Sequence, residues 1–193
     1  MAKGESGRFV TITGPMFSGK TSRLIELLER EQYAGRKIIL FKPAIDNRYS
    51  TVNVSTHKGI TLPAVVAPIG KEALPLMRER ANSADAIGVD ELQFWKSDSG
   101  VVEFLEGLSD SGKNVYVATL NRDHTGRPFE NTTKALSVAD EIHMLTAVCA
   151  KCGADATFSQ RILNGKESFG KRIVIGGKES YEPRCRHCFI RPK

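Results

Sequence analysis

The sequence predicts an α/β fold, in which a parallel sheet flanked by helices is followed by a small C-terminal module. Three observations predict it. Short β-rich apolar runs alternate with helical segments over residues 8–148, the glycine-rich stretch GPMFSGKT joins the first run to the first helix, and two CxxC pairs bracket the last part of the chain. Strands that alternate with helices form parallel sheets with right-handed crossovers. We therefore expect two domains, residues 1–148 and residues 149–193.

The first elements can be placed by their patterns. The apolar run at residues 8–13 is typical of a buried parallel strand. A charged helix follows, with leucines at helical spacing, and ends near Gly35. Residues 37–42 form a second strand. The polar stretch 46–59 has no period and is expected to be a loop.

The remaining elements continue the alternation. A helix over residues 72–81 tolerates its proline in the first turn, and a helix over 97–110 is closed by Gly112. Beyond residue 149 the pattern changes to short β-like runs at 157–163 and 172–177. The other expected elements are strands at 61–67, 86–90, 114–120 and 141–148, and a helix at 131–139.

Composition is that of an ordinary globular protein, with 40% hydrophobic and 26% charged residues. The 193 residues are enough to bury a core without disulfides. The N-terminal MAKGESG lacks the apolar segment of a signal peptide, and no apolar run reaches membrane-spanning length. We expect a cytoplasmic protein that does not contact a membrane.

The net charge of +6 is unevenly distributed. Residues 151–193 carry 10 basic and 4 acidic side chains, so the whole surplus lies there. Two interpretations stay open. The basic region binds nucleic acid or a phosphorylated ligand, or it is a solvated surface.

GPMFSGKT fits the phosphate-binding pattern G-x-x-x-x-G-K-[ST] between a strand and a helix. Its glycines let backbone N–H groups wrap an anion, and the helix N-terminus adds a favourable potential. Residues 121–124 (NRDH) do not complete the guanine-reading N-K-x-D pattern, which favours ATP over GTP. The lysine would reach the β- and γ-phosphates and the threonine would bind Mg²⁺. The expected phosphate-binding residues are Gly14, Pro15, Met16, Phe17, Ser18, Gly19, Lys20 and Thr21.

A second stretch, AIGVDELQFW, carries two adjacent carboxylates. Asp90 ends an apolar strand, where an acidic residue is costly unless it has a function, and Mg²⁺ binding is that function in P-loop proteins. In a continuing strand Glu91 points away from Asp90, so it can act as a general base towards a hydroxyl or water. The alternative is that Glu91 is a surface residue. Phe94 and Trp95 belong either to the core or to a pocket wall.

The two CxxC pairs, separated by 32 residues, predict one tetrahedral zinc site. Its ligands are Cys149, Cys152, Cys185 and Cys188, while His187 is expected to be a bystander. Between the pairs lie Gly176, Gly177 and Tyr181. A segment fixed at both ends by zinc suits a lid that excludes water. The alternative is that Tyr181 only packs on the zinc module.

Taken together, GPMFSGKT, VDELQFW, LNRDHTGRPF, CAKC, VIGGKESY and CRHC resemble, in this order, the type II thymidine kinases. The resemblance extends from about residue 7 to residue 188. It implies a RecA-like sheet and the transfer of the γ-phosphoryl group of ATP, with Mg²⁺, to the 5′-hydroxyl of thymidine. It further implies structural zinc, a homotetramer and feedback inhibition by thymidine triphosphate. Nucleic acid is not an expected partner.

The resemblance also assigns roles to residues. Glu91 is the general base, Asp90 serves Mg²⁺, and Arg48 in the stretch Asp46-Asn47-Arg48-Tyr49 assists at the transferring phosphate. Gln93 is also assigned to the phosphate-binding residues. The main chain of residues 172–176 reads thymine. The implied nucleoside-binding residues are Met16, Asp46, Phe94, Leu120, His124, Phe129, Arg172, Ile173, Val174, Ile175, Gly176 and Tyr181.

Four positions depart from common family residues: Leu92, Trp95, Asn121 and His124. They leave the shape of the pocket and the nucleoside preference open. The main alternative function is a P-loop ATPase with a zinc ribbon that acts on nucleic acid. A zinc-ribbon nucleic-acid-binding protein with a vestigial P-loop is a second one, against which the intact Lys20 and Thr21 argue.

Overall fold

A computed structural model describes residues 7–44, 53–55, 61–170, 172, 176–177 and 179–192. Several residues with expected roles lie outside these ranges: Asp46, Arg48, Ile173, Val174 and Ile175. Within the described ranges, no helix has both the length and the apolar character needed to cross a membrane.

The core is a six-stranded sheet in the order β5-β2-β6-β7-β1-β8, and every neighbouring pair is parallel. This confirms the predicted parallel sheet. The glycine-rich loop follows β1, and Asp90 follows β6, with β7 between these two strands. The strands are β1 (Phe9–Gly14), β2 (Ile38–Pro43), β5 (Val65–Ala67), β6 (Ala86–Val89), β7 (Asn114–Leu120) and β8 (Glu141–Met144).

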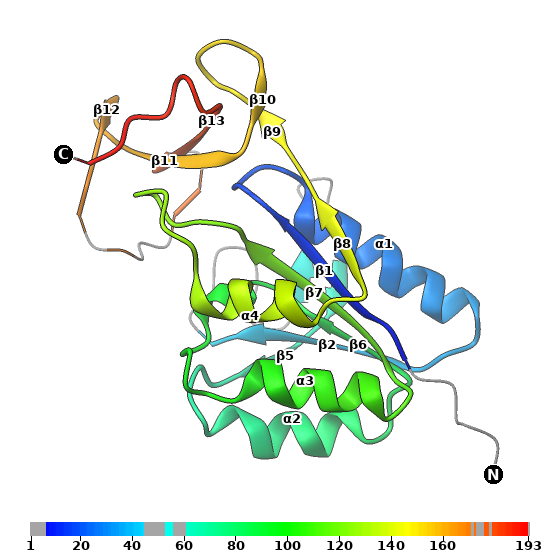
Figure 1. Cartoon of the computed structure of the whole chain (residues 1–193). Helices are drawn as coiled ribbons and strands as arrows, with labels where there is room; N and C mark the ends of the chain where they lie inside the picture. Colours follow the sequence, from blue (N-terminus) through cyan, green and yellow to red (C-terminus); the bar gives the residue numbers. More distant parts are fainter. Residues whose placement is uncertain are drawn as a thin grey trace.

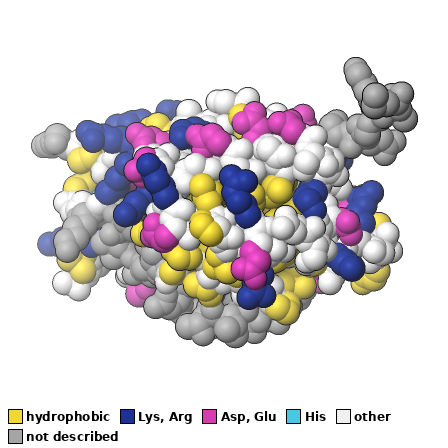
Figure 2. Space-filling view, turned by 90° about the horizontal axis from the view of Figure 1, so that it is seen from below, with side chains coloured by type: hydrophobic (Ala, Val, Ile, Leu, Met, Phe, Trp, Pro, Cys, Tyr) yellow, Lys and Arg dark blue, Asp and Glu magenta, His cyan; other side chains and the backbone are white. Residues whose placement is uncertain are grey.

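Helices cover both faces of this sheet (Figure 1). On one face α1 (Lys20–Tyr33) packs against alternate residues of β1, β2 and β7. On the other face lie α2 (Ala73–Ala81), α3 (Val101–Asp110) and α4 (Glu130–Val138). Because both faces are covered, the central strands are apolar without alternation. Figure 2 shows the α2 and α3 side, where the described acidic and basic side chains are interspersed with apolar ones.

The first helix follows from its sequence. Leu24, Leu27 and Leu28 are buried on its inner side, and its last turn is followed by Gly35 at φ 76°, as predicted. At its start, Gly19 is left-handed and no side chain caps the first turn. The first N–H groups of a helix need partners from outside, so this end is suited to an anion.

Several element boundaries differ from the prediction. The expected helix over 97–110 begins only at Val101, because Gly100 is left-handed with φ 77°. A 3₁₀ turn, η1 (Leu92–Phe94), precedes it and was not expected. The expected strand over 61–67 divides at Ala64: β4 (Thr61–Pro63) pairs with β3 (Asn53–Ser55), whereas β5 joins β2. The expected loop over 46–59 was therefore wrong at residues 53–55.

The strand expected over 141–148 divides in the same way. β8 ends in the central sheet at Met144, and β9 (Ala147–Val148) pairs with β10 (Asp155–Ala156). The two parts have different partners, because β8 pairs with β1 whereas β9 pairs with β10. β11 (Phe158–Leu163) confirms the expected run at 157–163, and it pairs antiparallel with β12 (Lys166–Glu167) and β13 (Tyr181–Arg184).

These C-terminal strands lie beyond the end of β8 (Figure 1). Their small cluster of buried residues, which includes Ala147, Cys149, Ala156 and Cys185, is separate from the two core clusters of the main sheet. In the run 172–177, the described residues Arg172, Gly176 and Gly177 are not in a strand. The division into domains at residues 148 and 149 stays a prediction.

A buried polar cluster lies beneath α1. Glu31 is 6% exposed. Its carboxylate accepts hydrogen bonds from the Tyr116 hydroxyl, from Asn114 Nδ2 at 3.0 Å and from Arg36 Nη1 at 2.6 Å. Burial alone would raise the pKa of Glu31, but the hydrogen bonds from Tyr116 and Arg36 outweigh it and lower the pKa.

We predict that Tyr116→Phe destabilises the fold by about 1.5–3 kcal/mol near neutral pH, because the hydroxyl bonds a charged group. A depressed carboxyl pKa contributes stability above the unfolded pKa of about 4.3, and this contribution is lost as pH falls through the folded value. Urea unfolding at several pH values measures the free energy of unfolding of wild type and Tyr116→Phe. Tyr33→Phe, at a 91% exposed site, is the control. A difference in the free energy of unfolding between wild type and Tyr116→Phe that stays constant down to acid pH would contradict the prediction.

Candidate phosphoryl-transfer site

The glycine-rich loop is held in a tight conformation between β1 and α1. A Cβ atom at Gly14 would lie 2.4 Å from the Leu145 carbonyl oxygen and 2.8 Å from Ser18 Oγ. Gly19 has φ 84° and Phe17 has φ 65°. A left-handed residue other than glycine is uncommon, and such strain clusters at ligand-binding sites.

Lys20 crosses this loop. Its ammonium group donates to the Pro15 carbonyl oxygen at 2.7 Å, which also accepts a hydrogen bond from Ser18 Oγ at 2.9 Å. The side chain is only 9% exposed. A buried lysine over the uncapped start of α1 suits a phosphate group, which would be met by both the ammonium and the backbone N–H groups.

Thr21 and Asp90 meet at the carboxyl edge of the sheet. The Thr21 hydroxyl lies 3.2 and 3.4 Å from the two Asp90 carboxylate oxygens, and the Glu91 backbone N–H donates to Asp90 Oδ1 at 3.1 Å. Asp90 is 5% exposed. Mg²⁺ binds hard oxygen ligands through one or two protein groups together with substrate phosphates, so this pair fits the ion expected with ATP.

Glu91 leaves the strand direction immediately after Asp90. Its φ is 56°, and the 3₁₀ turn η1 follows. Gln93 Nε2 donates to the Glu91 carboxylate. Gln93 Oε1 accepts from the Leu120 N–H at 2.9 Å and from Thr119 Oγ1 at 3.1 Å. The amide of Gln93 is therefore fixed in orientation, and it holds Glu91 at the end of β7.

The Gln93 contact continues into a buried hydrogen-bond chain. Thr119 Oγ1 lies 2.7 Å from Thr132 Oγ1 on α4, and Thr132 Oγ1 donates to the Leu120 carbonyl oxygen at 2.8 Å. Gln93 was expected among the phosphate-binding residues, whereas the sequence motifs gave Thr119 and Thr132 no role. The only feature of the sequence that could have indicated a role for them is their polar character, since Thr119 lies near the end of an apolar strand and Thr132 lies in a short helix.

The loop over residues 121–129 is stabilised by Asp123. Its Oδ1 accepts from the backbone N–H groups of Thr125 at 2.9 Å and Arg127 at 3.0 Å. Burial raises the pKa of Asp123, but the hydrogen bonds from Thr125, Arg127 and Arg172 lower it below the usual value. The carboxylate is thus a charged anchor within the loop.

Arg172 connects the segment between the cysteine pairs to this loop. Its Nε donates to Asp123 Oδ2 at 2.8 Å and its Nη2 to the Pro128 carbonyl oxygen at 2.8 Å. Its guanidinium also lies over the Phe129 ring, 5.1 Å from the centroid. The side chain of Arg172 is therefore occupied by loop 121–129.

His124 is buried in the same loop, with 2% of its surface exposed. Neither ring nitrogen has a hydrogen-bond partner of normal geometry. Burial lowers the pKa of His124, against the carboxylate of Asp123 and the carbonyl of Arg172, which raise it. Near neutral pH the ring is therefore uncharged. Phe129 and Tyr181 are each 7% exposed.

The C-terminal module contacts both the glycine-rich loop and loop 121–129. Ser159 Oγ on β11 accepts from the Met16 N–H at 2.9 Å, and the Thr157 carbonyl oxygen accepts from Asn121 Nδ2 at 3.0 Å. Of the positions that depart from the family, Leu92 and Trp95 are buried in the core between the sheet and α2 to α4. Phe94 is half-buried.

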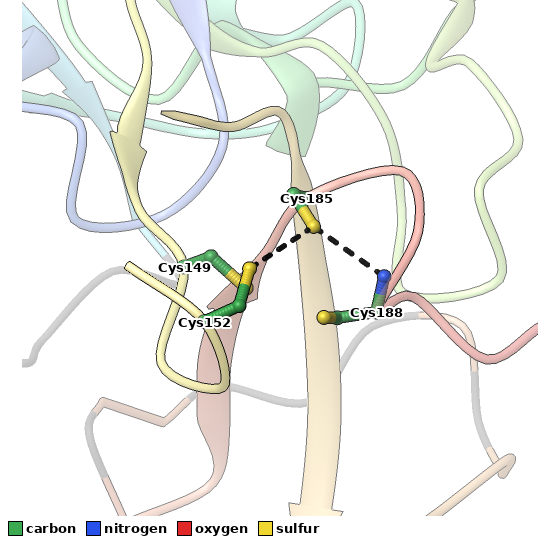
Figure 3. A group of neighbouring side chains, drawn as sticks. All are labelled: Cys149, Cys152, Cys185 and Cys188. Carbon is green, nitrogen blue, oxygen red and sulfur yellow. Dashed lines mark hydrogen bonds between the residues drawn. The ribbon is translucent and has the colours of Figure 1, made fainter. Parts of the chain in front are cut away.

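The four cysteines converge as the spacing predicts (Figure 3). Cys149 and Cys152 come from the turn after β9, and Cys185 and Cys188 follow β13. Their sulfur atoms all lie within 4.8 Å of one another, and Cys152 Sγ is 3.6 Å from Cys185 Sγ. Zinc–sulfur bonds of about 2.3 Å in a tetrahedron place sulfurs about 3.8 Å apart. The cluster therefore fits a zinc ion.

The thiols of the cluster differ in their pKa values. Burial would raise the pKa of Cys149, but backbone N–H groups of the two cysteine pairs lower it to about 6. Hydrogen bonds with the neighbouring thiols raise the pKa of Cys188 to about 12. A thiolate is the form that binds zinc. All four cysteines are free of disulfides, and His187 is exposed.

The fold and the site define a class. A glycine-rich loop of this pattern at the carboxyl edge of a parallel sheet, with a threonine–aspartate pair beside it and a second carboxylate next to that pair, is typical of P-loop phosphoryl-transfer proteins. The model of the family "thymidine kinase" matches residues 7–189. The chain belongs to the thymidine kinase family.

Three relatives are named thymidine kinase. One from Pyrobaculum aerophilum is 43% identical over 185 residues, covering 95% of this chain and 98% of the relative. One from Thermococcus kodakarensis is 45% identical over 190 residues, covering 96% and 95%. One from Mycoplasma capricolum is 42% identical over 186 residues, covering 94% and 88%. The similarity thus extends over almost all of each chain.

We predict that the purified protein binds zinc at the cysteine cluster and that Cys185→Ser lowers its zinc affinity by more than about 100-fold. Loss of an outer contact to a metal ligand already costs about 10- to 100-fold, and loss of a ligand costs more. Competition with a chromogenic chelator measures the affinity. His187→Ala, between two ligands but pointing to solvent, is the control. Unchanged zinc affinity in Cys185→Ser would exclude the four-cysteine site.

Proposed function

We propose that this protein is a thymidine kinase, which transfers the γ-phosphoryl group of ATP to the 5′-hydroxyl of thymidine and forms thymidine monophosphate and ADP. Family membership over residues 7–189 supports the reaction class. The observation that carries the proposal is the placement of Glu91, held by Gln93 directly beside the Asp90–Thr21 pair. A base at that position can accept the proton of a hydroxyl that attacks the γ-phosphorus.

In the proposed mechanism, Lys20 and the first N–H groups of α1 hold the phosphates. Thr21 and Asp90 would hold Mg²⁺, which would neutralise charge on the phosphate oxygens. Glu91 takes the proton of the 5′-hydroxyl while the 5′-oxygen of thymidine bonds to the γ-phosphorus. The bond between the γ-phosphorus and the β,γ-bridging oxygen breaks, and ADP leaves. Arg48 is proposed to stabilise the transferring group.

The nucleoside is proposed to lie between loop 121–129 and the segment between the cysteine pairs. Support comes from Arg172, which attaches that segment to Asp123 and Pro128, and from the buried Phe129 and Tyr181. The main chain of residues 172–176 would read the base. The further residues proposed to line the site are Met16, Asp46, Phe94, Leu120 and His124. Closure of this segment would exclude water and favour transfer over hydrolysis.

Zinc in this proposal is structural, because all four ligand positions are taken by cysteine. The resemblance adds a homotetramer and feedback inhibition by thymidine triphosphate. Edge strand β8 supports assembly, since Ile142 and Met144 are 47% and 59% exposed and β8 pairs only with β1 among the described strands. A monomeric mass in light scattering at micromolar concentration would remove the homotetramer from the proposal.

The test is phosphoryl transfer from labelled ATP with Mg²⁺ to thymidine, to deoxycytidine or to no acceptor, for wild type and Glu91→Gln. We predict transfer to thymidine, and a kcat about 100- to 10,000-fold lower in Glu91→Gln, the range for loss of a general base. Binding of the ATP complex should be retained. Phosphate release that is equal with and without acceptor would favour the alternative, an ATPase that acts on nucleic acid.

A further inference from the structure

Lys42, near the end of β2, is charged but only 3% exposed. No sequence motif assigned it a role. Lysine is almost never buried unless its charge is paired, because an isolated buried ammonium is costly. Its position in the sheet shows which groups it faces.

Side chains of β2 alternate between the two faces of the sheet. Leu40 packs with α1, and Phe41 packs on the opposite face. Lys42 therefore points to the α1 face, as Leu40 does. On the neighbouring strand β6, a Cβ atom at Gly88 would lie 2.6 Å from Leu28 of α1, so residue 90 faces α1 as well.

The strand register places Lys42 beside Asp90. Phe41 is paired with Val89, and the Asp90 N–H donates to the Phe41 carbonyl oxygen at 2.9 Å. The next residues along each strand, Lys42 and Asp90, are then neighbours, with about 5 Å between their backbones. Both lie at the carboxyl edge, where parallel sheets bind ligands. The Thr21 hydroxyl is 3.2 Å from the same Asp90.

The sheet order separates the two lysines of this edge. Lys20 approaches from the side of β1, whereas Lys42 approaches from β2, with β7 and β6 between those strands. Asp90 at the end of β6 lies on the path between them. A polyphosphate held by the P-loop and by the Asp90–Thr21 pair would therefore have cations on both sides.

We propose that Lys42 is a second phosphate-binding lysine, whose ammonium contacts the γ-phosphoryl oxygens of the ATP complex. The proposal rests on the proposed function. Lys42 supplies a compact positive charge on a flexible stem, on the side of the Asp90–Thr21 pair away from Lys20. A lysine that only balanced the charge of Asp90 would affect the affinities for ADP and for ATP equally. A lysine that contacts the γ-phosphate would raise the affinity for ATP alone.

The experiment compares the binding of ADP and of a non-hydrolysable ATP analogue, each with Mg²⁺, by calorimetry. The proteins are wild type, Lys42→Met, Lys42→Arg and the control Lys37→Met, an exposed lysine just before the amino end of the same strand. We expect wild type to prefer the triphosphate and Lys42→Met to lose about tenfold of that preference. Lys42→Arg should retain part of it, and Lys37→Met all of it.

Steady-state kinetics gives a second readout. We expect kcat in Lys42→Met to fall by about 100-fold, the cost of one donor to developing charge, with the KM for thymidine unchanged. Melting curves check the fold, and Lys42→Arg carries the test if Lys42→Met is unfolded. Full triphosphate preference in the folded variants, or equal losses for ADP and the analogue, would overturn the proposal. If wild type does not phosphorylate thymidine, the proposed function fails, but the binding comparison still decides the role of Lys42.

Discussion

The candidate site depends on one constraint, which is that two consecutive carboxylates must face different partners. Asp90 turns to Thr21 on the α1 side, and Glu91 must turn elsewhere without leaving the edge of the sheet. The chain achieves this by ending β6 with Glu91 in a left-handed conformation, φ 56°. Such a conformation costs about 1–3 kcal/mol and persists only where the surroundings impose it.

Gln93 is one of the residues that hold Glu91 in place. Its amide joins Glu91 to the Leu120 N–H and Thr119 hydroxyl on β7, and Thr132 on α4 continues the chain. The carboxylate of Glu91 is therefore positioned by regular elements of the core rather than by a mobile loop. A site supported in this way needs little reorganisation when the reaction begins.

The C-terminal module is connected to the same site at three points. Ser159 accepts from the P-loop, Thr157 accepts from Asn121, and Arg172 binds Asp123. Within the module, the buried Arg184 bonds Glu182 and the Cys188 carbonyl oxygen, which connects β13 to the second cysteine pair. Zinc at the cysteines would thus fix the base of this module, whose strand β11 contacts the glycine-rich loop through Ser159.

Much of this could be predicted from the sequence, because the signals are local. GPMFSGKT fixes the loop between β1 and α1, the apolar run 114–120 gives β7 with its observed bounds, and the CxxC spacing gives the cysteine cluster. The division of 61–67 and 141–148 between two sheets could not be predicted, since it depends on distant partners. The same holds for Arg172 and Asp123, which are 49 residues apart. The roles of Arg48 and of residues 173–175 stay predictions.

The most direct test of the account is a double-mutant cycle of Glu91→Gln and Gln93→Leu, measured as kcat for transfer from ATP to thymidine. If Gln93 acts by positioning Glu91, Gln93→Leu lowers kcat by about 10- to 100-fold in wild type and hardly at all in the Glu91→Gln background, because coupled residues are not additive. An equal loss in both backgrounds would show that Gln93 acts independently of Glu91, and would contradict the account.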